Sequence, residues 1–477
     1  MSRSAGMRRK TRIIATLGPA TEQPEMIERL LQAGVDVFRL NMSHGSHEEH
    51  RKNIRNIRRM AAKHRIHAAI FCDLCGPKIR VGELEGGSME LKARAVVVVT
   101  TRRVIGRDGV IPSQYGALHK DVKPGHRILL DDGKLELKVL AVKGRDIECR
   151  VVFGGTLTDH KGINLPDTEV SAPSLTEADR RDARFALEQQ VDLVALSFVR
   201  SAEDVLSLKR YLRRCGGELP IIAKIEKPQA LDNIQGILEE SHAIMVARGD
   251  LGIEIRPARV PMVQKELIDK ARVACKPVIV ATQMMESMIE SSRPTRAEVG
   301  DVSNAALHGA DAVMLSGETA VGRYPLQAVR YMSSILREAE QWRLGHPVCD
   351  DRLDMKVNES PRRALANAAM GIAEDLQLLA LFVPTRSGTT AMVVSAFRPV
   401  APVIGVCHDE RIARVLTLSW GVVPMLMKRR DIADWQGMSR KLARRLGLSL
   451  NDRSVAVLSG FGKSGQKDQP VLKILRF

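Results

Sequence analysis

The chain has 477 residues, of which 44% are hydrophobic and 27% are charged, and its formal net charge is +17. This length predicts about three globular domains, and no apolar run reaches the ~18 residues that a membrane-spanning helix requires. Aromatic residues make up only 3% of the chain, and the basic residues are spread along it. Composition and charge therefore disfavour nucleic acid and membranes as partners and favour small phosphorylated anions.

The seven cysteines are scattered and form no disulfide pattern. A chain of this size and apolar content builds its cores without cross-links. Residues 1–10 are polar and basic and are expected to form a loose tail, and nothing before the first predicted strand resembles a signal peptide. We therefore expect a reducing, cytoplasmic location.

From residue 11 to residue 76, short apolar strands alternate with amphipathic helices. The expected strands are 12–17, 35–40 and 67–72, and the expected helices are 24–33 and 46–63. Between residues 77 and 173 the pattern changes to short alternating strands, with DDGK and KGRD as typical hairpin turns. We interpret this segment as an inserted β-barrel lid domain, which carries Lys161 in an exposed glycine-containing turn.

The alternation of strands and helices returns at residue 174 and continues to residue 342. Five further strands are expected at 191–197, 220–225, 242–247, 277–281 and 311–315, and a helix is expected over 228–240. Eight strand–helix units in about 250 residues are typical of a TIM barrel. We therefore predict a (β/α)8 catalytic domain from 11–76 and 174–342. An open doubly wound sheet is the alternative, but it gives no reason for eight strands that each end in polar residues.

A polar linker, HPVCDDRLDMKVNESP, follows Gly345, and residues 343–477 are expected to form a C-terminal open-sheet α/β regulatory domain. After its first strand comes PTRSGTTA (384–391), at the start of a helix. Ser, Thr and Gly at a helix N-terminus suit an anion, although the same residues also simply cap helices. The candidate effector loop consists of Thr385, Arg386, Ser387, Gly388, Thr389 and Thr390.

Three charged residues lie at the ends of neighbouring predicted barrel strands: Lys224, Glu226 and Asp250. The carboxyl ends of parallel strands meet at one edge, where barrels place their chemistry. Two carboxylates there suit a divalent ion with oxygen ligands, and the lysine would face the anion that this ion holds. The alternative for each residue is a solvated loop charge or a surface salt bridge.

Several strings of the chain resemble the pyruvate kinase family, in the family's order. They are ATLGP (15–19), FRLNMSHG (38–45), DLCGPKIR (73–80), NLP (164–166), AKIE (223–226), MVARGDLGIEI (245–255), ATQMMESMI (281–289), PTRAEVGDVSNA (294–305) and AVMLSGETAVGRYP (312–325). The resemblance covers almost all of the first 340 residues, whereas the C-terminal part matches mainly by pattern and by the PTRSGTTA loop.

This resemblance implies phosphoryl transfer from phosphoenolpyruvate to ADP, giving pyruvate and ATP. It implies Glu226 and Asp250 as ligands of Mg²⁺ or Mn²⁺, and Lys224 as the cation that stabilises the moving phosphoryl group. The other implied residues fall into three groups. The catalytic and substrate-binding group comprises Arg39, Gly249, Asp250, Thr282 and Ser316. The nucleotide-binding group comprises Pro19, Asn41, His44, Arg80 and Lys161. The monovalent-cation region comprises Asn41, Ser43, Asp73, Leu74 and Lys78.

One departure from the family changes an expectation. Many members need K⁺ and carry a glutamate in a GPEIR-type string, whereas this chain has Lys78 in GPKIR. A fixed ammonium supplies the charge of a monovalent ion, so we expect activity without added K⁺. The alternative is a surface lysine without this role. The C-terminal GFGKSGQKDQPVLKILRF also differs from the family's usual ending.

Two rival functions remain open from the residues. A different Mg²⁺-dependent barrel acting on phosphoenolpyruvate or pyruvate, such as a lyase or mutase, explains Glu226 and Asp250 but not the inserted domain with Lys161. A non-catalytic RNA- or partner-binding protein is supported only by the net charge. The resemblance further implies a homotetramer and a phosphorylated allosteric effector at the candidate effector loop.

Overall fold

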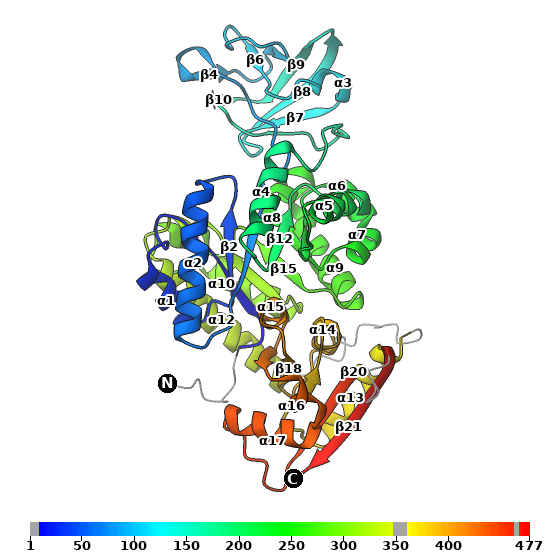
Figure 1. Cartoon of the computed structure of the whole chain (residues 1–477). Coiled ribbons are helices and arrows are strands. Elements are labelled where there is room, and N and C mark those ends of the chain that lie inside the picture. Colours follow the sequence, from blue (N-terminus) through cyan, green and yellow to red (C-terminus); the bar gives the residue numbers. More distant parts are fainter. Residues whose placement is uncertain (1–8, 347–359, 462–466) are drawn as a thin grey trace.

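The structure, a computed structural model, describes residues 9–346, 360–461 and 467–477. Figure 1 shows three stacked parts, with a β-rich unit above a β/α barrel and a smaller α/β unit below it. Most of the predicted tail (1–10), most of the predicted linker and part of the atypical C-terminal string lie outside the described residues. No helix within these ranges combines the length and the apolar character needed to cross a membrane.

Eight parallel strands close into a barrel in the order β1-β16-β15-β14-β13-β12-β3-β2, so the predicted fold class is confirmed. The strands are β1 (Arg12–Thr16), β2 (Val37–Asn41), β3 (Ala69–Asp73), β12 (Leu193–Leu196), β13 (Ile221–Ile225), β14 (Ala243–Ala247), β15 (Val278–Ala281) and β16 (Ala312–Leu315). Their residues alternate between two cores, as strand geometry requires. Ile14, Phe71 and Met245 belong to the cluster inside the barrel, whereas Ile13, Ile70 and Val246 pack under the outer helices.

Amphipathic helices cover the outside of the barrel (Figure 1). They are α1 (Pro24–Ala33), α2 (His47–Lys63), α4 (Glu177–Glu188), α5 (Ala202–Arg214), α6 (Pro228–Asp232), α7 (Ile234–Glu240), α8 (Arg248–Glu254), α9 (Val260–Val273), α10 (Arg296–Leu307), α11 (Gly317–Ala320) and α12 (Pro325–Gly345). The single helix expected over 228–240 is two helices that meet at Asn233. This asparagine donates through Nδ2 to the carbonyls of Arg200 and Gln229, at 3.0 Å each, and such a side chain competes with helix continuation.

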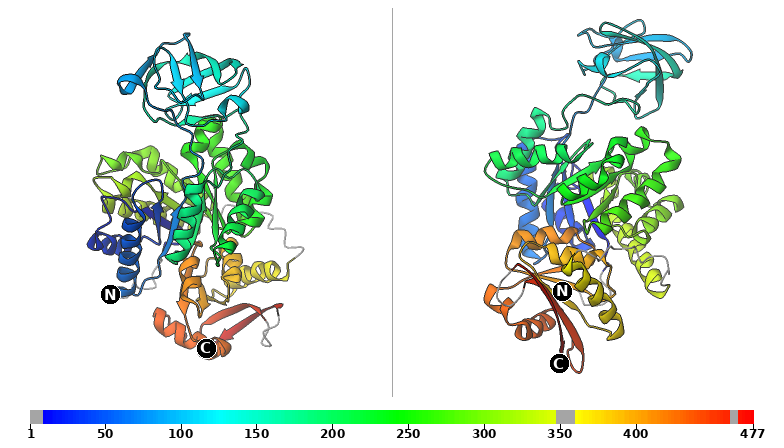
Figure 2. Two further views of the ribbon diagram at one scale, coloured as in Figure 1. Left: turned by 45° about the horizontal axis from the view of Figure 1, so that its top comes forward. Right: turned by 90° about the vertical axis from the view of Figure 1, so that its right-hand side faces the viewer.

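The β-rich unit is inserted between β3 and α4 and contains two sheets. One has the order β11-β7-β8-β9-β5-β6 and the other pairs β10 with β4. The strands are β4 (Ser88–Leu91), β5 (Val96–Thr100), β6 (Val110–Pro112), β7 (Arg127–Leu130), β8 (Leu135–Lys143), β9 (Asp146–Phe153), β10 (Gly155–Thr158) and β11 (Ile163–Asn164), with the short helix α3 (Leu118–Asp121). DDGK joins β7 to β8 and KGRD joins β8 to β9, as the sequence predicts. Figure 2 shows this unit standing over one end of the barrel.

The C-terminal unit is a five-stranded sheet in the order β19-β18-β17-β20-β21, parallel except for β21, which runs antiparallel to β20. Its elements are α13 (Pro361–Asp375), β17 (Leu381–Pro384), α14 (Thr389–Ala396), β18 (Val403–Cys407), α15 (Glu410–Val415), β19 (Val422–Leu426), α16 (Arg429–Ala433), α17 (Trp435–Leu446), β20 (Ser454–Phe461) and β21 (Lys467–Arg476).

The C-terminal unit closes the amino end of the barrel. Leu418, which follows α15, belongs to the cluster of residues inside the barrel. Two buried carboxylates of the barrel bind arginines of this unit: Asp311 binds Arg398 at 2.9 Å, and Asp192 binds Arg414 at 2.8 Å. The opposite, carboxyl end of the strands is therefore the end left open to solvent and to the inserted unit.

Candidate active site

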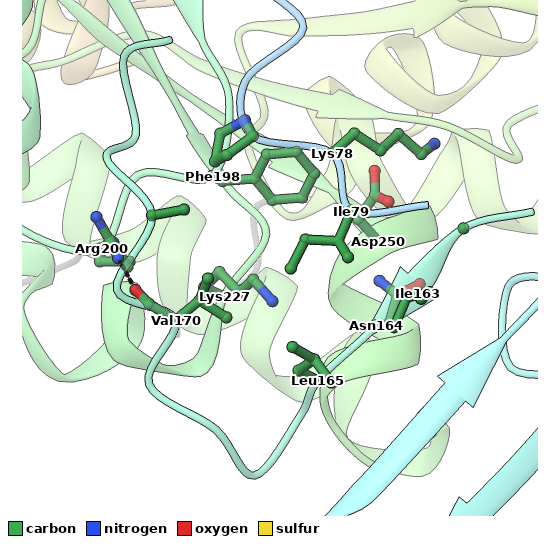
Figure 3. Close-up of a pocket in the computed structure, with 13 residues that line it drawn as sticks. Lys78, Ile79, Ile163, Asn164, Leu165, Val170, Phe198, Arg200, Lys227 and Asp250 are labelled. Carbon is green, nitrogen blue, oxygen red and sulfur yellow. Dashed lines mark hydrogen bonds between the residues drawn. The ribbon is translucent and has the colours of Figure 1, made fainter. Parts of the chain in front are cut away.

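An open cleft lies between the inserted unit and the carboxyl end of the barrel. Lys78 and Ile79 line it from the segment that leaves the barrel, and Asn164 lines it from the returning segment. Asp250 lines it from the barrel side. Figure 3 shows the carboxylate of Asp250 and the long side chain of Lys78 on the same side of this cleft. The cleft is thus built from segments far apart in the sequence.

Lys224 lies in β13 and points into a cage of three oxygens. Its Nζ is 2.7 Å from Ser197 Oγ, 2.9 Å from Glu226 Oε1 and 3.3 Å from Asp73 Oδ1. Burial lowers the pKa of Lys224, but the charges of Asp73 and Glu226 outweigh burial and raise it above its usual value. The ammonium group therefore stays charged, and the strand fixes its position.

Arg39, in β2, is joined to the same cluster through Asp73 at the end of β3. Its Nε donates to Asp73 Oδ2 at 2.7 Å, and its Nη1 donates to Thr16 Oγ1 at 3.3 Å. Burial raises the pKa of Asp73, but Lys224 and Arg39 together hold it below its usual range. Oδ1 of Asp73 makes the 3.3 Å ion pair with Lys224. One buried carboxylate thus holds two fixed cations side by side.

Glu226 and Asp250 are close enough to influence each other. Burial raises the pKa of Glu226, and the neighbouring charge of Asp250 raises it further against the opposing effect of Lys224. Glu226 Oε2 accepts the backbone N–H of Phe198 at 2.7 Å. The half-buried carboxylate of Asp250 lies on the cleft wall and has no hydrogen-bond or ion-pair partner among the described residues. Asp250, which has no protein partner, and the adjacent Glu226, whose oxygens each have one protein contact, together fit a divalent cation.

The described residues contain no cluster of three His, Cys, Asp or Glu side chains able to hold a metal. This finding is compatible with magnesium, which is usually bound through one or two carboxylates and takes its remaining ligands from water and substrate. Sites of this type are incomplete until the substrate supplies its oxygens. The donor set of Glu226 and Asp250 consists of hard oxygens, which Mg²⁺ and Mn²⁺ prefer.

Thr282 and Gly249 lie together beside this pair of carboxylates. The N–H of Gly249 donates to Thr282 Oγ1 at 2.7 Å, and this hydroxyl donates to the carbonyl of Ala281 at 2.6 Å. Ser316 follows β16, and its Oγ is buried without a hydrogen-bond partner in the described residues. Its N–H donates to Glu318 Oε2 at 2.6 Å, and burial raises the pKa of Glu318. The polar ends of β14, β15 and β16 therefore meet at one side of the barrel mouth.

The predicted nucleotide residues fall into two groups. Pro19, Asn41 and His44 lie in barrel loops, where Asn41 Nδ2 is 3.0 Å from His44 Nδ1. Arg80 and Lys161 belong to the inserted unit, where the backbone of Arg80 bridges to that of Gly162. The Nζ of Lys161 is bound to Asp131 at 2.8 Å and is 40% exposed, so the predicted exposed lysine has a partner. The two groups thus belong to different units of the chain, and none of the five residues is among those that line the cleft.

Only some residues of the predicted monovalent-cation region lie close together. Asn41 Oδ1 accepts the N–H of Ser43 at 3.3 Å, and Asp73 is bound to Arg39 and Lys224 as described. The carbonyl of Leu74 accepts Ser197 Oγ–H at 2.7 Å. Lys78 is exposed and forms no ion pair within the described ranges. In this structure Lys78 therefore contributes to the cleft wall and not to the pair of Asp73 and Arg39.

The candidate effector loop (385–390) joins β17 to the first turn of α14. Thr385 Oγ1 accepts the N–H of Gly388 at 3.0 Å, and the hydroxyls of Ser387 and Thr389 are 2.9 Å apart. Gly388 has a φ of 87°, in the left-handed region that favours glycine. The loop belongs to the C-terminal unit, at the opposite end of the molecule from the cleft (Figure 1).

Three residues with contacts at the site were missed by the sequence reasoning: Ser197, Arg248 and Asp301. Ser197 follows β12, so the rule that polar residues end barrel strands would have found it. Arg248 directly follows β14, so the same rule would have found it, and it contacts the carbonyls of Thr282 and Gln283. Asp301 lies in the middle of α10, and no local pattern indicates that it reaches Arg248.

Catalysis in β/α barrels takes place at the carboxyl end of the strands, so the fold and the open cleft define an enzyme. The fixed cations Lys224 and Arg39, close to the partner-free carboxylate of Asp250, indicate one that acts on anionic substrates. Family models described as "Pyruvate kinase, barrel domain" and "Pyruvate kinase, alpha/beta domain" match residues 8–329 and 363–475. The chain belongs to the pyruvate kinase family, and it is therefore a phosphotransferase.

Curated relatives and a solved structure agree with these models. The chain is 44% identical to pyruvate kinase 2 of Synechocystis sp., over 88% of this chain and 71% of the relative. It is 43% identical to the pyruvate kinase of Corynebacterium glutamicum, over 92% and 91% of the two chains. A pyruvate kinase structure from Cryptosporidium parvum superposes with a TM-score of 0.91 at 37% identity, covering 98% of this chain and 96% of that one.

Proposed function

We propose that this chain transfers the phosphoryl group of phosphoenolpyruvate to ADP, giving pyruvate and ATP. The observation that carries the proposal is the cluster of Lys224, Arg39 and Asp73 beside the carboxylates of Glu226 and Asp250, in a chain of the pyruvate kinase family. Phosphoryl transfer depends mainly on positioning and on neutralising spread negative charge, and this cluster supplies both.

The reaction is tested by following pyruvate and ATP together from phosphoenolpyruvate and ADP. Equal amounts of both products, formed only when ADP is present, are expected. Consumption of phosphoenolpyruvate without ATP would support the rival lyase or mutase, and no turnover by folded protein would support the non-catalytic rival.

Glu226 and Asp250 would hold the divalent ion, Mg²⁺ or Mn²⁺. When bound, such an ion neutralises phosphate and carboxylate charge and orients the two substrates. Binding of Mn²⁺ to the folded protein, measured by electron paramagnetic resonance, tests the ligands independently of activity. Asp250→Asn is expected to weaken the binding at least tenfold, whereas Asp269→Asn, in α9, is expected to leave it unchanged. Equal affinity in both variants would contradict the assignment.

The roles of the protein groups follow from their positions. Lys224 would neutralise charge that develops on the phosphoryl group and on the enolate oxygen, and Arg39 would bind the phosphate. The backbone N–H groups around Gly249 and Asp250 would hold the substrate carboxylate. Thr282 and Ser316 would lie on the face where the enolate receives its proton.

We propose that residues 11–76 and 174–342 act as the catalytic domain, with 77–173 as a lid that brings Arg80 and Lys161 to the nucleotide. The distribution of the nucleotide residues over two units supports this division, because closure is needed to bring them together. Lys161→Met is expected to raise the KM for ADP and to leave the KM for phosphoenolpyruvate within about twofold. An unchanged KM for ADP would contradict the role of Lys161.

We further propose that the reaction needs no added K⁺, because Lys78 supplies a fixed positive charge near the substrates. Lys78 lines the cleft together with Asp250, and this position supports the role. The segment that carries Lys78 also connects the barrel to the inserted unit. Turnover with K⁺ replaced by tetramethylammonium is expected to equal turnover in K⁺. Lys78→Glu is expected to make turnover K⁺-dependent, and Lys92→Glu, on an exposed position of the inserted unit, serves as its control. A many-fold loss of wild-type turnover without K⁺ would overturn the proposal.

The effector loop (385–390) supports regulation by a phosphorylated metabolite, since its hydroxyls and the first turn of α14 suit a phosphate group. Velocity against phosphoenolpyruvate, measured with a panel of sugar phosphates and AMP, tests this role. At least one compound is expected to shift the curve, and Thr390→Asp is expected to remove the shift. A hyperbolic curve untouched by every compound would contradict regulation at this loop. We also propose a homotetramer and a cytoplasmic location, the first of which sedimentation measures directly.

A further inference from the structure

The turn after β15 has an unusual backbone at the site of a proposed catalytic group. Thr282 has a φ of 68° and Gln283 a φ of 52°, so two consecutive residues other than glycine are left-handed. This conformation is especially unfavourable for a β-branched residue such as threonine. Strained residues persist only where the surroundings hold them, and they concentrate at functional sites. The turn therefore needs a structural cause.

The side chain of Arg248 supplies that cause. Its Nη2 donates to the carbonyl of Thr282 at 2.6 Å and to the carbonyl of Gln283 at 3.1 Å, and its Nε lies 3.2 Å from the first of these. The arginine is only 8% exposed. A planar guanidinium presents several donors in a fixed geometry, which a lysine does not. Arg248 thus binds the two carbonyls that the left-handed turn presents on one side.

Asp301 orients this guanidinium from the opposite side. Its two carboxylate oxygens lie 2.7 and 2.6 Å from Arg248 Nη1. The ion pair engages Nη1 alone, which leaves Nε and Nη2 for the carbonyls. Asp301 belongs to α10, whereas Arg248 begins α8, so the contact ties two helices to the end of β15. A buried ion pair with only a structural role would not need to face the strained turn.

The strained turn fixes the hydroxyl of Thr282. Its Oγ1 accepts the N–H of Gly249 at 2.7 Å and donates to the carbonyl of Ala281 at 2.6 Å. Gly249 follows Arg248 directly and precedes Asp250. Arg248 therefore sets the position of the hydroxyl relative to the backbone that would hold the substrate carboxylate.

We propose that Arg248, oriented by Asp301, is a positioning residue that holds the Thr282 hydroxyl at the reacting face by binding the Thr282 and Gln283 carbonyls. This inference rests on the proposed role of Thr282. A hydroxyl displaced by about 1 Å loses roughly a hundredfold in rate. The effect should appear in kcat, because neither Arg248 nor Asp301 is among the residues that line the cleft.

The test compares Arg248→Lys, which keeps the charge, with Arg259→Lys, an exposed arginine in the segment before α9. Arg248→Lys is expected to lower kcat about 10- to 100-fold, with the KM for phosphoenolpyruvate within threefold and the melting temperature close to that of the wild type. Exchange of pyruvate methyl protons with deuterated water, followed by NMR, is expected to fall at least as far as kcat. Arg259→Lys should change none of these quantities.

A double-mutant comparison separates positioning from a general effect on the site. In a Thr282→Ala background, Arg248→Lys is expected to cause no further loss of kcat, since the group that it positions is already absent. A further loss of tenfold or more would overturn the inference. Asp301→Asn is expected to lower kcat about three- to tenfold with the same lack of additivity, and it decides the question if Arg248→Lys does not fold.

The two proposals fail in different ways. If Thr282→Ala keeps the kcat of the wild type, the proposed role of Thr282 is wrong. If Thr282→Ala loses activity while Arg248→Lys and Asp301→Asn keep theirs, the role of Thr282 stands and the positioning role of Arg248 is wrong.

Discussion

At the amino end of the barrel every oxygen of Asp311 is occupied, whereas at the carboxyl end the carboxylate of Asp250 has no hydrogen-bond or ion-pair partner among the described residues. Asp311 Oδ1 accepts from Arg398 at 3.2 Å and from the N–H of Trp420 at 3.0 Å. Its Oδ2 accepts from Arg398 at 2.9 Å and from the N–H of Val278 at 3.1 Å. Both ends bury charge, but only one leaves bonding capacity for a ligand.

The comparison teaches how to separate structural charge from functional charge in one fold. A buried ion pair whose remaining atoms are hydrogen-bonded closes a surface. A carboxylate beside a cleft whose oxygens have no protein partner can bind a ligand, and such groups indicate candidate functional sites. The presence of the salt bridge alone does not distinguish the two cases. Four substitutions test this comparison of the two ends of the barrel.

Asp311→Ala should have the largest effect on stability. It leaves the guanidinium of Arg398, only 3% exposed, without its carboxylate, and the loss of one partner from a buried pair costs roughly 3–5 kcal/mol. Chemical denaturation is expected to show this loss, with kcat of the remaining folded protein within about twofold of the wild type. A variant of normal stability but low kcat would contradict the structural role of this end.

Lys224→Met should show the opposite pattern. Removal of a charge that stabilises the transition state costs about 10²–10³ in kcat, or ~3–4 kcal/mol of activation free energy. Arg39 still neutralises Asp73, so we expect the melting temperature to fall by no more than a few degrees. Steady-state kinetics and thermal unfolding on the same sample check both statements. Turnover near that of the wild type would refute the role of Lys224.

Leu418→Ala should weaken the contact between the C-terminal unit and the inside of the barrel. Leu418 is fully buried, and truncation of a buried leucine to alanine costs about 2–3 kcal/mol or more when the cavity does not collapse. Leu376→Ala, at an exposed position of the same unit, is the matched control and should change stability by less than ~0.5 kcal/mol. Equal effects of the two substitutions would show that the barrel end is not sealed by this side chain.

The smallest expected effect is on the pH dependence of the free energy of unfolding. His242 lies at the start of β14, and burial together with Lys276 lowers its pKa from 6.5 to about 4. The folded protein resists protonation of this ring, whereas the unfolded chain takes up the proton below pH 6.5. The contribution of the neutral ring to stability is therefore complete above pH 6.5 and is lost as the pH falls towards 4.

His242→Gln should remove this part of the pH dependence. We expect the stability of the wild type, relative to the variant, to change by roughly 1–2 kcal/mol between pH 7 and pH 4.5. Denaturation curves at both pH values provide the measurement. Parallel pH profiles of the two proteins would assign the titration to other groups.

The sequence predicted the elements whose pattern is local. The eight strands, the inserted β segment and the charged strand ends at Lys224 and Asp250 all follow from periodicity and from the rule that polar residues end barrel strands. The break at Asn233 was missed because a helical pattern continues across it, and only a side-chain contact to Arg200 from another loop interrupts it. The carboxylate of Asp301 was missed because its partner lies 53 residues away in the chain.

The backbone of Thr282 shows a second limit. Threonine favours extended conformations, so nothing in its identity indicates a left-handed turn. The contacts of Asp311 with Arg398 and of Leu418 with the barrel core also depend on how two domains meet. Local pattern therefore located the candidate site, whereas the contacts that orient its groups required the tertiary structure.

The position of Leu418 has a consequence for any shortened form of the protein. A chain truncated after α12 would retain all eight barrel strands but would uncover the amino end of the barrel, where the cluster of Ile14, Phe71 and Met245 loses its contact with Leu418 and Asp311 loses Arg398. Such a fragment is expected to aggregate. The catalytic unit is therefore expected to need the C-terminal unit in order to fold.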